Sequence, residues 1–493
     1  MVLIVDGHKF QYEMENLCRV FFPNEHIEVT SDTTGDIDEK LVVTTSLKEI
    51  NIEEIELFVS FQKAEKNGTR SEIIRKDINT DLELKMADML FNLLCNATNY
   101  TPKWGILTGV RPSKLMTKLI EEMGEEKAKE YFENSLKVSP QKTNLAFEVS
   151  KLEEKIIEKS KPNSFSLYVS IPFCPSRCSY CSFVSHSITS PTAKKLLPEY
   201  FDLLCEEIRE TSKMSKEIGL NLETIYIGGG TPSILSADQI DKLLSVICFN
   251  FDITNLREFT FEAGRPDTID AEKLEIIKKY PVTRISINPQ TFSDDVLKEI
   301  GRNHSAQRTI EIYNLAREIG FTNINMDIIA GLPTDTLQSF ENTLNTLLDL
   351  SPSNITVHTL ALKRSSNLNN DIATSNNGKL ACDMVDLAAE MLSKNDYLPY
   401  YMYRQSKSVG NLENVGWCKE GFEGYYNIYM MEECHTVLAV GAGAVIKLKS
   451  PSNNYIERIF NFKYPYEYNT RFETILERKQ EIYKFYELQN FGG

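Results

Sequence analysis

The chain has 493 residues, of which 42% are apolar and 25% are charged, a composition typical of a globular protein with two or three domains. Its net charge of −16 argues against a nucleic-acid partner or an anionic membrane surface, because either would need a basic face. No stretch approaches the roughly 20 apolar residues of a membrane span, no secretory signal is visible, and the ten cysteines do not form a disulfide framework, so we expect a cytoplasmic, reduced protein.

Residues 1–160 predict a separate α/β domain that ends in a charged helical linker. Strands are expected at 2–6, 26–31, 41–45 and 55–62, and helices at 8–22, 82–95 and 125–161. Residues 101–115 read TPKWGILTGVRPSKL, which is either an anion-binding turn near Arg111 or a structural loop packed by Trp104. A lone glycine-containing turn is weak evidence for a site, so we favour the loop.

The most informative stretch is residues 167–183, LYVSIPFCPSRCSYCSF, which places Cys174, Cys178 and Cys181 on a loop directly after a predicted strand. Proline, arginine and serine between the cysteines make a poor core segment, so three buried thiols packed as hydrophobes are disfavoured. Zinc held by these cysteines and His186 is one alternative. The other is an iron–sulfur cubane, which normally takes four cysteines and would here keep one iron open to a small molecule.

From residue 165 to about 362, short strand patterns alternate with longer helical patterns. Strands are predicted at 165–171, 224–227, 258–262, 283–287, 323–329 and 354–362, with helices at 191–218, 237–249, 271–279, 306–319 and 336–348 between them. Such βα units in series predict a parallel sheet curled into a partial (βα)6 TIM-like barrel. Functional residues of these folds lie where the strands end.

Polar or glycine-rich features follow strand after strand in this region. The cysteine loop follows the first strand, residues 228–232 (GGGTP) follow the second, and Glu262, Gln290 and Asp327 mark the next three. Glycines allow a close backbone approach, and acidic residues can bind ribose hydroxyls or an amine. Arg302 can hold a carboxylate through its planar fork. A ligand with an amino acid at one end and a nucleoside at the other, namely S-adenosylmethionine (SAM), fits these groups and an open iron.

These motifs also carry a family resemblance. CPSRCSYC after a strand, followed by GGGTP and FEAG, is similar to the radical SAM superfamily. Within it, the chain resembles the oxygen-independent coproporphyrinogen III oxidase family through LYVSIPFCPSRCSYC, IYIGGGTPSIL, RISINPQTFSDDVLKEIGRNHS and NINMDIIAGLPTDT, over about residues 165–445. The long N-terminal extension and YYMYRQSKSVGNLENVGW look closest to the HemZ-type coproporphyrinogen dehydrogenase branch.

The resemblance implies a radical SAM barrel over residues 161–362, with a [4Fe–4S] cluster on Cys174, Cys178 and Cys181. It also implies a set of positions around SAM, namely Tyr168, Tyr180, Gly229, Gly230, Thr231, Glu262, Gln290, Arg302, Asp327 and Ile328. Of these, Tyr168, Glu262 and Arg302 are predicted to be catalytic.

The activity that the resemblance implies is oxidative decarboxylation of coproporphyrinogen III in anaerobic heme (porphyrin) biosynthesis. A 5′-deoxyadenosyl radical would take a hydrogen from the β-carbon of a propionate, carbon dioxide would leave, and one electron would pass to an acceptor, which leaves a vinyl group. Two propionates treated in this way give protoporphyrinogen IX. The expected partners are the tetrapyrrole substrate, a flavodoxin- or ferredoxin-like electron donor, and an electron acceptor.

Residues 363–493 are expected to form an α+β region that covers the barrel mouth and contacts the substrate. A helix is predicted at 376–394, and residues 398–405, LPYYMYRQ, gather tyrosines around Met402 before Arg404. These residues suit a flat ring fringed with carboxylates. They equally suit a buried aromatic strand with a surface arginine.

Three positions depart from the pattern of the best-known coproporphyrinogen oxidases. Phe183 stands where those enzymes have a further cysteine, Ser170 stands where they have histidine, and Arg265-Pro266 follows Glu262 in place of an Asp-Pro or Asn-Pro ending. These departures weaken the assignment of the substrate, whereas the assignments of the cluster and of SAM are unaffected. The alternatives are a heme chaperone of the same superfamily and a radical SAM enzyme acting on another tetrapyrrole.

Overall fold

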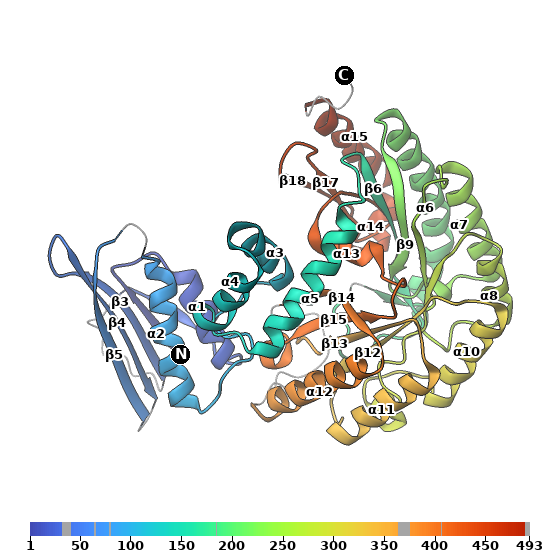
Figure 1. Ribbon diagram of the computed structural model, residues 1–493. Coiled ribbons are helices and arrows are strands. Elements are labelled where there is room, and N and C mark those ends of the chain that lie inside the picture. Colours follow the sequence, from blue (N-terminus) through green and yellow to red (C-terminus); the bar gives the residue numbers. More distant parts are fainter. Residues whose placement is uncertain are drawn as a thin grey trace. The chain divides into compact units, whose positions relative to one another are not determined.

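The computed structural model describes residues 1–31, 41–63, 66–77, 80–183, 185–362, 375–405 and 407–488 (Figure 1). The chain divides into two compact units: unit 1 comprises Met1–Ser150, Asn370–Lys379 and Tyr403–Glu413, and unit 2 comprises Lys151–Asn369, Leu380–Met402 and Asn414–Gly493. The domain boundaries expected at residues 160 and 362 stay predictions, and residues 363–374 lie outside the described part. Among the described residues, no helix combines the length and the apolar character needed to cross a membrane.

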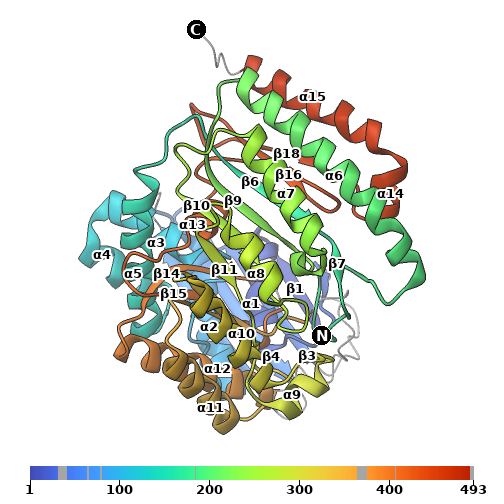
Figure 2. The same ribbon diagram turned by 90° about the vertical axis from the view of Figure 1, so that its right-hand side faces the viewer.

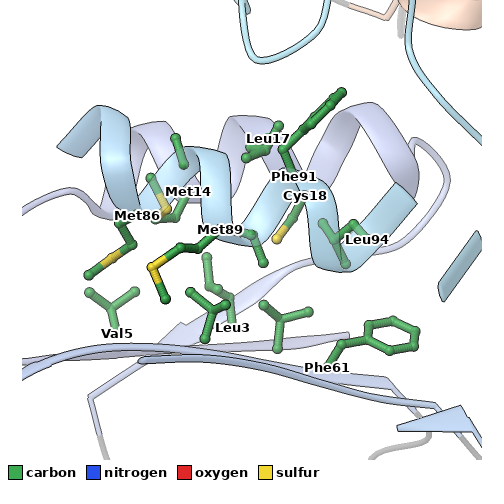
Figure 3. Close-up of a cluster of buried hydrophobic side chains, with 14 of the residues drawn as sticks. Leu3, Val5, Met14, Leu17, Cys18, Phe61, Met86, Met89, Phe91 and Leu94 are labelled. Atoms are coloured by element: carbon green, nitrogen blue, oxygen red, sulfur yellow. The ribbon is translucent and has the colours of Figure 1, made fainter. Parts of the chain in front are cut away.

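Unit 1 is built on a five-stranded sheet with the order β2-β1-β3-β4-β5. The strands are β1 (Val2–Asp6), β2 (Glu28–Thr30), β3 (Leu41–Glu49), β4 (Glu54–Lys63) and β5 (Lys66–Arg75). Helices α1 (Gln11–Phe21) and α2 (Leu82–Thr98) cover one face, and Leu3, Met14 and Met89 pack there without any exposure (Figure 3). Sequence analysis missed β5 because its residues, KNGTRSEIIR, are mostly polar and exposed.

The helical segment predicted at 125–161 is interrupted. It contains α4 (Glu125–Glu130), a π-helical turn η1 (Tyr131–Ser135) and α5 (Pro140–Ile157), and it is preceded by α3 (Pro112–Met123). Lys137 has a left-handed φ of 59°, and Pro140 is the first residue of α5. A left-handed residue breaks a helix, and a proline lacks the amide that a helix interior needs. The prediction of one continuous helix at 125–161 was therefore wrong.

The Trp104 loop is structural. Trp104 is 1% exposed, and its Nε1 donates to Glu413 Oε2 at 2.7 Å. The buried Arg404 guanidinium donates to the carbonyls of Leu107 and Gly109 and lies 5.4 Å from the Trp104 ring centroid. Arg404 therefore holds this loop within unit 1. The strand at 398–404 is buried, as one of the two interpretations expected, but the arginine that it placed on the surface is buried too, and the contact with a substrate stays a prediction.

Unit 2 is organised by an eleven-stranded sheet with the order β14-β15-β13-β12-β11-β10-β9-β6-β16-β17-β18. Its central strands pair in parallel throughout. These are β6 (Ser164–Ile171), β9 (Asn221–Gly229), β10 (Glu258–Glu262), β11 (Arg284–Ser286), β12 (Ile324–Ala330) and β13 (Asn354–Thr359). The predicted partial (βα)6 barrel is confirmed.

Helices line the outer side of this sheet (Figure 2). They are α6 (Pro191–Glu217), α7 (Ala237–Asn250), α8 (Ala271–Lys278), α9 (Asp294–Glu299), α10 (Ala306–Ile319) and α11 (Leu337–Leu350). Side-chain caps begin several of them: Ser236 and Gln239 form a capping box on α7, and Asp270 caps α8.

The C-terminal region contributes strands to both edges of the same sheet. Its elements are α12 (Ser375–Lys394), β14 (Leu398–Arg404), η4 (Val409–Asn411), β15 (Glu413–Cys418), α13 (Tyr425–Glu432), β16 (Thr436–Val440), β17 (Val445–Lys449), β18 (Ile456–Phe460), α14 (Pro465–Thr470) and α15 (Phe472–Leu488). β16 pairs in parallel with β6, so the end of the chain extends the barrel next to its first strand.

One buried carboxylate ties this C-terminal region to the barrel. Glu207 on α6 accepts hydrogen bonds from the Gly441 amide at 2.7 Å, the Tyr468 hydroxyl at 2.6 Å and Asn461 Nδ2 at 2.8 Å. The Lys479 ammonium lies 3.1 Å from Glu207 Oε1, and both side chains are fully shielded from solvent. Buried charges persist only when they are paired and hydrogen-bonded, and this group meets both conditions.

We predict that Glu207→Ala lowers the free energy of unfolding of unit 2 by about 3–5 kcal/mol, because it leaves the Lys479 ammonium buried without its counter-ion. Asp202→Ala is the matched control: Asp202 also lies on α6 and also pairs with a lysine, Lys242, but both side chains are at least half exposed. It should cost less than about 1 kcal/mol. Guanidinium denaturation would measure both, and equal costs would contradict the prediction.

Candidate functional site

The predicted site residues gather at one edge of the barrel sheet. Because β6 to β13 run in parallel in adjacent order, their carboxyl ends meet at the same edge. Gly229 closes β9 and Glu262 closes β10. Gln290 follows β11 and forms an isolated parallel β-bridge with Ile328 on β12. Its backbone carbonyl accepts a hydrogen bond from the Ile329 amide at 3.0 Å. Gln290 has a φ of 68°, in the left-handed region that few residues other than glycine adopt.

The cysteine loop is closed by a short ladder at its base. β7 (Phe173–Cys174) pairs in parallel with β8 (His186–Ser187), and within the loop the Cys181 amide donates to the Cys178 carbonyl at 3.2 Å. Cys174 and Cys178 are buried, Cys181 is partly exposed, and all are free thiols. Burial raises the pKa of the Cys181 thiol, and the nearby Cys178 and Cys174 thiols act in the same direction.

The glycine-rich turn after β9 holds the cysteine loop in place. The Gly230 amide donates to the Ile171 carbonyl, the Thr231 amide donates to the Phe173 carbonyl, both at 2.8 Å, and Thr231 Oγ1 lies 3.4 Å from Cys174 Sγ. A Cβ added at Gly230 would lie 2.6 Å from the Phe173 oxygen. The close approach expected of these glycines is therefore made to the cysteine loop, while their approach to a ligand stays a prediction.

Two arginines flank the cysteine loop from the barrel side. Arg302 donates to the Asn288 carbonyl at 2.9 Å and to the Tyr180 hydroxyl at 3.2 Å, and its Nε is buried without a partner in the described part of the chain. Arg265 is 4% exposed, and its Nη1 lies 3.2 Å from Cys178 Sγ. Sequence analysis had noted Arg265 only as a departure from a motif, because a strand-end arginine gives no signal of what it contacts.

The acidic residues Glu262 and Asp327 lie on β10 and β12, on either side of β11, and differ in protonation. Burial raises the pKa of Glu262 to about 7, against the lowering effect of the Tyr226 hydroxyl that hydrogen-bonds to it. Burial acts on Asp327 in the same direction, but His358, 3.7 Å away, and Asn325, which donates at 2.7 Å, lower the pKa of Asp327. At neutral pH Asp327 is ionised, and Glu262 is close to its midpoint.

An aromatic stack lies beside Glu262. The rings of Tyr226 and Tyr426 are 4.5 Å apart, and Tyr168 stacks at 6.3 Å from Tyr226 and 6.2 Å from Tyr426. Tyr168 was predicted from sequence. The position of Tyr226 could have been predicted. It lies two residues before Gly228 on β9, so the two residues lie on the same face of the strand. Tyr426 lies on α13 and carried none.

A cavity of about 440 Å³ opens between the cysteine loop and the C-terminal strands. Its lining includes Tyr168 and Gly229 from the barrel, Phe183 from the cysteine loop, and Phe460 and Lys463 from β18 and the segment after it. Phe183 and Phe460 are 67% and 56% exposed. The cavity therefore combines apolar aromatic surface with a cationic side chain.

The donor set fits an iron–sulfur cluster. No three His, Cys, Asp or Glu side chains of the described residues converge on a point where a single metal ion would bind. A cubane makes a different demand, because each cysteine binds an iron at its own corner. Thr231 and Arg265 each aim a hydrogen-bond donor at a cysteine sulfur, which suits thiolates that ligate a cluster.

Comparison with known proteins agrees with this geometry. Residues 168–347 match the family model described as the radical SAM superfamily. The structure superposes on coproporphyrinogen III oxidase (HemN) from Escherichia coli with a TM-score of 0.51 and 22% identity, covering 66% of this chain and 72% of that one. Residues 168–347 thus form a radical SAM domain, and the structural likeness shows the same fold; the superfamily implies a [4Fe–4S] cluster and SAM.

Curated relatives narrow the assignment. The oxygen-independent coproporphyrinogen-III oxidase-like protein HemZ of Bacillus subtilis is 38% identical over 79% of this chain and 78% of its own length. The heme chaperone HemW of the same organism is 32% identical over 64% of this chain and 82% of its own length. The chain belongs to the oxygen-independent coproporphyrinogen III oxidase-like family.

We predict that Gly230→Ala disrupts the cysteine loop, because the new methyl group collides with backbone atoms of Ile171 and Phe173 that cannot move independently of β6. After anaerobic reconstitution the variant should hold several-fold less iron and acid-labile sulfide than the native chain. Gly109→Ala, whose nearest contact would be a Leu107 side-chain atom at 3.8 Å, is the matched control. Native cluster content in Gly230→Ala would contradict this role.

Proposed function

We propose that Cys174, Cys178 and Cys181 bind a [4Fe–4S] cluster and that SAM binds between this loop and the carboxyl ends of the barrel strands. The support is the placement of the three thiols on one loop, where the Cys181 amide donates to the Cys178 carbonyl, and the donors aimed at two of their sulfurs. Bound there, the cluster and SAM would supply a 5′-deoxyadenosyl radical. The protein would bind both, orient the substrate and keep water out.

The charges around the site suggest how SAM is oriented. Arg302 has a buried Nε without a described partner and lies beside the cysteine loop, so it would receive the ligand carboxylate. Glu262 and Asp327 lie along the strand ends and would receive the amine or the ribose hydroxyls. Gly229, Gly230 and Thr231 would contact the methionine portion, whereas Gln290 and Ile328 would contact the nucleoside. Tyr168 and Tyr180 would flank the cluster and the adenosyl group.

The proposed reaction is the oxidative decarboxylation of coproporphyrinogen III propionates to vinyl groups. The observation that carries it is the 38% identity to HemZ over 79% of the chain, which extends well beyond the radical SAM segment at 168–347. The cavity supports a tetrapyrrole substrate, because Phe183 and Phe460 offer apolar aromatic surface to its pyrrole rings and Lys463 offers a cation to a carboxylate.

A heme chaperone is the second candidate, favoured by the 32% identity to HemW over 82% of that protein's length. The two functions make different demands on the same barrel. An enzyme must consume SAM when it meets coproporphyrinogen III, whereas a chaperone must bind heme and release it to an acceptor protein.

Product analysis separates the candidates. With anaerobically reconstituted protein, reductant and SAM, we expect methionine and 5′-deoxyadenosine release that rises on addition of coproporphyrinogen III, with vinyl-bearing porphyrin formed. Cys178→Ala should abolish both, and Cys248→Ala, which removes a cysteine of α7 far along the sequence from the loop, should leave both intact. Heme binding and transfer to an apo-acceptor without vinyl product would favour the chaperone. A linear tetrapyrrole product would indicate a different substrate.

The raised pKa of Glu262 predicts pH-dependent SAM binding. Glu262 is mostly neutral below pH 7 and ionised above it, so the affinity for the cationic ligand should rise by up to roughly tenfold between pH 6 and pH 8. Anaerobic equilibrium dialysis with SAM would measure this rise. In Glu262→Gln the rise should shrink to what the ligand's own amine contributes. An unchanged pH profile in the variant would show that Glu262 does not face the ligand.

A further inference from the structure

We propose that Arg265 donates a hydrogen bond to the thiolate of Cys178 and raises the reduction potential of the cluster bound there. The guanidinium is buried, and its Nη1 is 3.2 Å from Cys178 Sγ. Its Nη2 donates to the Ser176 hydroxyl at 3.0 Å, so the same side chain grips the cysteine loop at two points. The proposal rests on the cluster site proposed above, and it is independent of which tetrapyrrole is the substrate.

The orientation of Arg265 is fixed from behind. Asp267 accepts from Arg265 Nε at 3.2 Å and from Nη2 at 3.4 Å, and the buried His304 lies 3.8 Å from the same carboxylate. The guanidinium therefore cannot rotate away from the sulfur without breaking these contacts. A planar fork that serves a carboxylate, a hydroxyl and a sulfur at once is a geometry that lysine cannot reproduce.

The effect on the cluster follows from electrostatics. Reduction adds one negative charge to a cluster that already has thiolate ligands, and the buried guanidinium favours the more negative state, with part of its charge offset by Asp267. A hydrogen bond to a ligating sulfur acts in the same direction. Arg265 thus makes the first electron transfer easier, and it fixes the position of the loop that carries the cluster.

The test is a redox titration of the reconstituted cluster in the absence of SAM. Electron paramagnetic resonance measures the reduced cluster at each potential. Arg265→Gln should make the cluster harder to reduce. At a fixed potential near the native midpoint, the ratio of reduced to oxidised cluster should fall at least tenfold, equivalent to about 59 mV for one electron. Arg308→Gln removes the same charge from a partly exposed site on α10 and should leave the ratio unchanged.

Arg265→Lys keeps the charge but loses the fork, and it should give a ratio between native and Arg265→Gln. If Arg265→Gln cannot hold a cluster, the titration of Arg265→Lys tests the proposal in its place. A native midpoint in whichever variant retains the cluster would overturn the proposal. Native protein without acid-labile sulfide would instead overturn the cluster site itself, and this proposal with it.

Discussion

The backbone contact between the glycine turn after β9 and the cysteine loop after β6 is the constraint on which the rest of the site depends. β6 and β9 are parallel neighbours, so the loop and the turn leave the sheet side by side. The Gly230 and Thr231 amides bind carbonyls of the segment that leads to Cys174, and a side chain at Gly230 would not fit. The segment that leads to Cys174 is therefore positioned by main-chain hydrogen bonds to the glycine turn.

Charges around the site are separated by sign. Arg265 and Arg302 lie against the cysteine loop, whereas Glu262 and Asp327 lie on the barrel strands. This separation suits a zwitterionic ligand that carries a further positive charge, since its carboxylate and its cationic groups would be drawn to different ends of the site.

The sequence predicted the barrel well because its signals are local. Each strand of the (βα)6 core is a short β-rich run, and the parallel order places glycine, glutamate and aspartate features at one edge. Contacts between distant segments could not be predicted in this way. Arg265 reaches a sulfur 87 positions back along the chain, and Tyr426 enters the tyrosine stack from α13. Neither of these long-range contacts leaves a periodic pattern in the sequence. The edge strand β5 was missed for another reason: its residues are polar and exposed, so it lacks the apolar alternation that marks a strand.

The C-terminal region forms one side of the cavity beside the cysteine loop. The superfamily match ends at residue 347, yet the cavity beside the cysteine loop is lined on one side by Ala442, Phe460 and Lys463. The turn containing Ala442 is held by buried groups on α6: Glu207 binds the Gly441 amide, and the Tyr200 hydroxyl accepts from the Ala442 amide. A rigid turn with exposed aromatic and cationic neighbours can change its ligand through those neighbours alone. The side chains after β16 therefore shape one wall of the cavity in which we propose that the tetrapyrrole binds.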